Sequence, residues 1–135
     1  MPRPAQEPEF ARRARALSSA LLALHRALLG EVRGEYERTH GPQSPVRMFD
    51  LLVNDPAFAW LRPLSGAVAQ LDELLATETD RAPYRNLVKD LHQMLGSGDP
   101  AHPFAGTYGR YLQSPPVAGA HGAGRKALTR FEELL

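Results

Sequence analysis

The sequence predicts an all-α protein, and three observations lead to that fold class. Apolar side chains recur at spacings of three and four residues over long segments, which is typical of helices with one buried face. Proline follows a serine or an aspartate where several such segments begin, as it does at helix starts. No segment alternates apolar and polar residues over more than four positions, so no sheet is expected. We predict a single-domain bundle of four main helices plus one or two short helices.

The longest helix is expected over residues 8–39. Pro8 suits the first helical position, and Gly41 followed by proline ends the helix. The helix carries one apolar stripe, made of Phe10, Ala14, Leu17, Leu21, Leu24, Leu28, Val32 and Tyr36. Gly30 and Gly34 lie inside it, and each costs up to about 1 kcal/mol relative to alanine. Packing of the stripe must offset that cost.

Two proline-marked starts follow this helix. Residues 44–52 are expected to form a short helix with Ser44 as its cap. Residues 54–76 form the third helical segment, which contains Pro63. That proline either kinks the helix or separates a short turn at 56–62 from a longer helix.

The second half of the chain is expected to hold two more helices. One begins between Asp80 and Pro83, and the last is capped by Ser114 and weakened by three glycines. Between them lies a Pro/Gly-rich loop region at 96–116, in which a short stretch can be helical. Residues 1–135 form one domain, and residues 1–7 are expected to be disordered.

The composition excludes several classes of function. The chain has 16 basic and 15 acidic residues and a formal net charge of +1, which argues against a nucleic-acid partner. It has no cysteine, so disulfides, thiolate catalysis and cysteine-ligated zinc are excluded. No run of apolar residues is long enough for a membrane span, and a cytoplasmic location is expected.

Polar residues on apolar faces are the candidate site residues. His25 lies within the stripe of the first helix, and His121 has a similar place on the last helix. Asp72 borders the buried face of the third helical segment. A buried imidazole or carboxylate needs hydrogen-bond partners. We therefore predict a contact between His25 and Asp72, joined by Ser65 or Ser18.

Several interpretations of these residues remain open. The pair is a structural contact that fixes helix register, or an imidazole acting as base or ligand in a pocket, or two side chains that reach solvent. His25, Asp72 and His121 also have the composition of a two-histidine, one-carboxylate metal site. Their spacing gives no complete ligand set, and the single Glu37-x-x-His40 motif lacks the second copy that di-metal bundles use. No metal and no cofactor are expected.

Trp60 and Arg62 stand beside the proline break at residue 63. Trp60 is expected in the core or half-buried, with an interface anchor as the alternative. Arg62 is expected to pair with Asp55 or Asp72, or to hold an anionic ligand. The chain has no nucleophile elbow, phosphate loop or dinucleotide fingerprint, so no catalytic residue is assigned and a non-enzymatic role is favoured.

Four segments carry a resemblance to a known family: LHRALL at 24–29, EYER at 35–38, DPAFAWLRPLS at 55–65 and LDE at 71–73. They resemble a family of small bacterial helical proteins that is uncharacterised. The resemblance covers residues 17–75 and, more loosely, 111–126. It implies a bacterial origin and no particular activity.

Two functional hypotheses follow. The leading one is a cytoplasmic helical-bundle interaction or regulatory module that binds a protein partner or self-associates as a homodimer. The alternative is a metal- or small-ligand-binding bundle with a site around His25, Asp72 and His121. An exposed apolar patch favours the first hypothesis, and a pocket where those polar groups converge favours the second.

Overall fold

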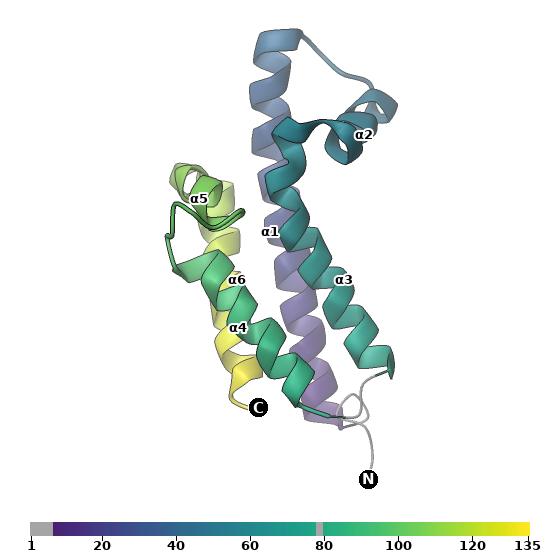
Figure 1. Cartoon of the computed structure of the whole chain (residues 1–135), viewed down its shortest axis with the longest axis vertical. Coiled ribbons are helices and arrows are strands. Elements are labelled where there is room, and N and C mark those ends of the chain that lie inside the picture. Colours follow the sequence, from purple (N-terminus) through teal and green to yellow (C-terminus); the bar gives the residue numbers. More distant parts are fainter. Residues whose placement is uncertain (1–6, 78–79) are drawn as a thin grey trace.

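The computed structural model describes residues 7–77 and 80–135 of the chain. This part is all-α and contains no strand, and it forms a bundle of four long and two shorter helices (Figure 1). The long helices are α1 (Pro8–His40), α3 (Arg62–Thr77), α4 (Ala82–Gly96) and α6 (Pro115–Glu132). The shorter helices are α2 (Pro45–Asn54) and α5 (Ala105–Tyr108), and two 3₁₀ helices are η2 (Pro56–Leu61) and η3 (Gly109–Gln113).

The proline-marked starts lie where the sequence predicts them. The Ser44 side chain accepts a hydrogen bond from the Arg47 backbone N–H at 3.1 Å and so caps α2. The Asp55 carboxylate accepts one from the Ala57 N–H at 2.9 Å and caps η2. Pro63 is the second residue of α3, where its missing N–H does no harm. Of the two alternatives predicted at Pro63, the structure has the division into a short turn and a longer helix.

The central helix of the fold is α1, whose contacts with α6 and α3 are the most extensive in the molecule. Both neighbours run antiparallel to it (Figure 1). The predicted stripe of α1 is buried from Phe10 to Val32. At the start of α1, Phe10 makes edge-on ring contacts with Tyr84 of α4 and Phe131 of α6, each at 5.1 Å between centroids. This cluster ties three helices together with large apolar surfaces.

The region 96–116 holds the short helical stretch that the sequence predicts within this loop region. It contains α5 and η3, and it buries three aromatic side chains, those of Phe104, Tyr108 and Tyr111. His102 Nδ1 accepts hydrogen bonds from the backbone N–H groups of Phe104 and Ala105, both at 3.1 Å, and so stabilises the start of α5. Gly106 is required there because a Cβ would lie 2.5 Å from the Pro100 carbonyl oxygen.

The last helix, α6, is continuous although it contains three glycines. A Cβ built at Gly119, Gly122 or Gly124 meets no atom within 4 Å. These glycines therefore do not serve close helix approach, and their effect is confined to lower helix propensity. Ser114 occupies the cap position, but its hydroxyl donates to Glu31 Oε1 of α1 at 2.6 Å instead of capping α6. That bond anchors the start of α6 to α1.

The first residues are only partly within the described structure. Residues 1–6 of the segment expected to be disordered lie outside the described residues. Glu7 is placed, and its carboxylate pairs with Arg81 at 2.7 Å between Oε2 and Nη2. None of the helices in the described ranges is long and apolar enough to cross a membrane.

Candidate functional site

The short helix α2 carries apolar side chains on two opposite faces. Met48 and Leu51 point inward and are buried. Val46, Phe49 and Val53 point outward and are 80%, 68% and 49% exposed. Within residues 7–77 and 80–135, the only other exposed large hydrophobic side chain is Leu22. We call Val46, Phe49 and Val53 the outer row of α2.

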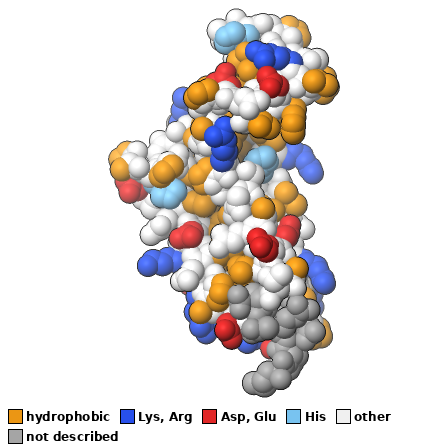
Figure 2. All heavy atoms as spheres, turned by 45° about the vertical axis from the view of Figure 1, so that its right-hand side comes forward, with side chains coloured by type: hydrophobic (Ala, Val, Ile, Leu, Met, Phe, Trp, Pro, Cys, Tyr) orange, Lys and Arg blue, Asp and Glu red, His pale blue; other side chains and the backbone are white. Residues whose placement is uncertain are grey.

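An open cleft of about 430 Å³ lies beside the outer row, between α1, α2 and the start of α3. We call it the apolar cleft, because six of its lining side chains are hydrophobic: Leu29, Phe49, Leu52, Val53, Phe58 and Leu61. Figure 2 shows orange hydrophobic side chains gathered over α2 and on the surface next to it. Exposed apolar side chains beside a cleft with hydrophobic walls make this the candidate binding surface of the described structure.

Three polar residues complete the lining of the apolar cleft: His25, Arg62 and Ser65. The Arg62 guanidinium donates from Nη2 to the Val53 carbonyl oxygen at 2.6 Å, so it caps the C-terminal end of α2. The Ser65 hydroxyl donates to the Arg62 carbonyl oxygen at 3.1 Å. Arg62 therefore fixes α2 against α3, and it does not form the predicted ion pair with Asp55 or Asp72.

His25 is half-buried at one wall of the apolar cleft. Burial lowers the pKa of its imidazole, so the neutral ring prevails at pH 7. No described residue makes a hydrogen bond to this ring, and no buried side-chain nitrogen among the described residues lacks a partner, so its ring nitrogens are accessible to water or to a bound group. His25 thus keeps the place on the apolar face that the sequence predicts.

Asp72 is exposed and lies away from the apolar cleft. It accepts a hydrogen bond from the Ser18 hydroxyl at 3.4 Å, and among the described residues it is not paired with His25. The predicted His25–Asp72 contact is therefore wrong, although Ser18 is one of the two serines expected to join it. The reason is axial position: His25 shares the cleft with Ser65, two helical turns before Asp72 on α3.

His121 lies in a different part of the bundle. Its Nδ1 is 2.6 Å from the Tyr108 hydroxyl, which is buried beneath it. Burial lowers the pKa of His121, and the nearby charge of Arg125 lowers it further. His25, Asp72 and His121 therefore do not converge.

No group of three potential metal-ligating side chains occurs in the part of the chain that the structure describes. Both residues of the Glu37-x-x-His40 motif make contacts with residues close to them in the sequence. Glu37 accepts hydrogen bonds from Arg33 and from the Gln43 backbone N–H, and His40 stacks on Tyr36 with 4.1 Å between ring centroids. These contacts close the C-terminal end of α1.

Trp60 is half-buried, as expected, but faces away from the apolar cleft. Its ring stacks on Tyr111 at 5.3 Å and 10°, and it packs against Phe104 at 5.6 Å. The Tyr111 hydroxyl donates to Glu35 Oε2 at 2.9 Å. Trp60 therefore joins η2 to the α5–η3 region.

Sequence reasoning missed the outer row of α2. Val46, Phe49 and Val53 have the spacing of one helical face, so the signal was present in the periodicity. Met48 and Leu51 give an equally good buried face, and only the packing shows that the short helix is apolar on both sides.

Comparisons of the chain with protein-family models, with curated proteins and with solved structures found no match.

Proposed function

We propose that the protein is a cytoplasmic interaction module that self-associates through the outer row of α2 and the apolar cleft beside it. The observation that carries this proposal is the exposure of Val46, Phe49 and Val53 on one short helix next to a cleft with hydrophobic walls. Covering these side chains removes apolar surface from water, at roughly 25 cal/mol per Å².

The outer row is suited to pairing with its own copy. At 100° per residue, its three side chains lie within about 60° of one another around α2. In a two-fold dimer with antiparallel α2 helices, Val46 of each copy meets Val53 of the other. Phe49 lies next to the two-fold axis and faces the walls of both clefts.

Charge complementarity supports the same arrangement. Arg47 and Asp50 flank the outer row and pair within α2 at 2.9 Å, with both side chains about half exposed. The two-fold pairing brings the two Asp50 side chains together beside the axis on one flank, and each Arg47 is on that flank within reach of Asp50 of the other copy. The formal net charge of +1 leaves little long-range repulsion between copies.

The first experiment compares oligomeric state in wild-type protein and two variants, by sedimentation velocity over a range of concentrations. Phe49→Asp is expected to be monomeric, because a carboxylate would be buried without a partner in the dimer. Ala118→Asp places the same charge on an exposed position of α6 and is expected to associate like the wild type. Circular dichroism checks that both variants keep their helix content. A wild-type chain that stays monomeric to millimolar concentration contradicts the proposal.

A mixing experiment tests the orientation of the two copies. Arg47→Glu makes the flank wholly acidic and Asp50→Arg makes it wholly basic, so each variant alone is expected to associate at least about tenfold more weakly. In an equimolar mixture, the glutamate introduced in the first variant lies opposite the arginine introduced in the second, and association is restored as a heterodimer. If the mixture associates no better than its components, the antiparallel pairing of α2 is wrong.

A further inference from the structure

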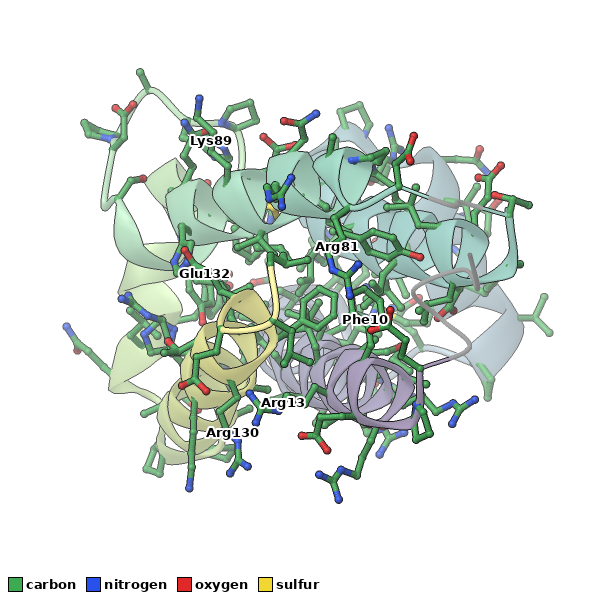
Figure 3. All side chains as sticks on the ribbon, turned by 90° about the horizontal axis from the view of Figure 1, so that it is seen from below. Phe10, Arg13, Arg81, Lys89, Arg130 and Glu132 are labelled. Atoms are coloured by element: carbon green, nitrogen blue, oxygen red, sulfur yellow. The ribbon has the colours of Figure 1, made fainter. Side chains whose placement is uncertain are left out.

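A second, larger cleft of about 740 Å³ lies between α4 and α6, away from α2. Three of its lining side chains are cationic, those of Arg85, Lys89 and Arg125, and His92 lies among them. Only one lining residue is acidic, Glu132. Figure 3 shows Lys89 on α4 and Glu132 on α6 along the same side of the molecule. We call this the basic cleft.

The positive charge of the basic cleft is not balanced from within. Glu132 Oε2 is 2.5 Å from His92 Nε2, so the carboxylate is engaged by the imidazole. Neither Lys89 nor Arg125 has an ion pair with any carboxylate in the described ranges. Arg85 is held by the main-chain oxygen of Leu135, so Lys89 and Arg125 are the two cations of the cleft that no described carboxylate balances, while the chain as a whole is almost neutral. Cations held close together favour an anion between them.

Two of these cations are held in place before any ligand arrives. The Arg125 guanidinium lies against Gly96, where an added Cβ would come within 2.6 Å of Nη1. Gly96 is the last residue of α4, and the partial negative charge of a helix C-terminus favours a cation there. Arg85 donates from Nε and Nη2 to the Leu135 carbonyl oxygen at 3.2 and 2.9 Å. Fixed donors bind with less loss of side-chain entropy than mobile ones.

The walls of the basic cleft also offer apolar surface. Val88 and Leu135 line it together with the charged side chains. A volume of this size suits a metabolite and not an extended polymer, which would need a longer basic stripe. Arginine binds the oxygens of a phosphoryl group through paired N–H donors, and lysine adds a point charge.

We propose that the basic cleft binds a small phosphorylated organic molecule, with its phosphoryl group between Lys89 and Arg125 and its carbon skeleton against Val88 and Leu135. This site is separate from the apolar cleft and does not depend on self-association.

Isothermal titration calorimetry with glucose 6-phosphate, inorganic phosphate and glucose tests the proposal at constant ionic strength. Glucose 6-phosphate is expected to bind most tightly, inorganic phosphate more weakly, and glucose not at all. Lys89→Gln and Arg125→Gln are each expected to weaken phosphate binding at least about tenfold, as loss of a charge-assisted donor does. Arg38→Gln removes the same charge from an exposed position at the end of α1 and is expected to leave the affinity unchanged.

Two further variants distinguish a defined binding site from non-specific electrostatic attraction of the anion to the protein. Glu132→Gln removes the only carboxylate of the basic cleft and is expected to strengthen binding. Gly96→Ala keeps every charge but displaces the Arg125 guanidinium, and it is expected to weaken binding. Circular dichroism checks that each variant is folded. The absence of binding by both phosphate probes at millimolar concentration overturns the proposal, as does equal weakening by Arg38→Gln and Arg125→Gln.

Discussion

Ser18 on α1 donates a hydrogen bond to Asp72 on α3, with 3.4 Å between Oγ and Oδ1. The two helices are antiparallel (Figure 1). His25 lies seven residues after Ser18 on α1, and it therefore lies at the level of Ser65, which is seven residues before Asp72 on α3. Seven residues span about 10 Å along a helix. The register of two helices therefore decides which polar side chains meet, even when several share a face.

This register makes a stability prediction. Ser18→Ala and Asp72→Ala are expected to be coupled by about 0.5 kcal/mol, the size of one long and partly exposed hydrogen bond. His25→Ala and Asp72→Ala are expected to add without coupling. Urea denaturation of the single and double variants measures the coupling free energy of each pair. A coupling above about 1 kcal/mol between His25 and Asp72 would show that they meet in solution after all.

The contact between Trp60 and Tyr111 gives a second prediction. Trp60→Ala removes a half-buried ring that joins η2 to the α5–η3 region, and it is expected to cost about 2–3 kcal/mol of unfolding free energy. Tyr111→Phe keeps the stacked ring and removes only the hydroxyl bonded to Glu35, so about 1 kcal/mol is expected. Denaturation followed by circular dichroism compares the two variants. An equal loss in both would assign the stability to the hydroxyl and not to the stack.

Local features of the fold could be predicted from the sequence because they depend on neighbouring residues. Ser44 and Asp55 cap helices through backbone N–H groups two or three residues away, and Pro63 ends the preceding turn. The stripe of α1 depends only on helical periodicity.

The partners of long side chains were not predictable in the same way. Arg62 binds the Val53 carbonyl oxygen and not a carboxylate, and the Ser114 hydroxyl reaches Glu31 across the α1–α6 interface. Both contacts depend on the relative position of helices in three dimensions. The apolar cleft also depends on how the helices are placed. His25 and Ser65 were expected as site residues, but the wall that α2 forms opposite them was not.

Two glycines give a third prediction, because replacing each by alanine is expected to change the unfolding free energy in opposite directions. Gly122→Ala in α6 is expected to stabilise the fold by about 0.5–1 kcal/mol, because a Cβ meets nothing within 4 Å and alanine is the better helix former. Gly106→Ala is expected to destabilise it, because the new Cβ would lie 2.5 Å from the Pro100 carbonyl oxygen. Thermal and urea unfolding report both effects. Destabilisation by Gly122→Ala would mean that α6 packs more closely than described.

The half-buried imidazole of His25 gives a fourth prediction, on pH dependence. Burial lowers its pKa below the value of about 6.5 that it has in the unfolded chain. Between these two values the unfolded state binds more protons, so unfolding free energy rises with pH and falls on acidification. Well above a pH of about 6.5 His25 is neutral in both states and contributes no pH dependence. His121, whose pKa is lowered by burial and by Arg125, acts in the same direction.

His25→Gln is therefore expected to flatten the stability profile between roughly pH 5 and 7, and His25→Gln with His121→Gln to flatten it further. The carboxylates whose pKa values are lowered, Glu9 and Glu37, lose their contribution only below about pH 4.3 and leave this window clear. Denaturation at a series of pH values, with a nuclear magnetic resonance titration of the imidazole signals, measures both quantities. A pKa of about 6.5 for His25 would mean that its ring is fully solvated, and a higher pKa would mean that it contacts a carboxylate. The apolar cleft would then lack the half-buried wall assigned to it, because a ring desolvated by hydrophobic neighbours must resist protonation.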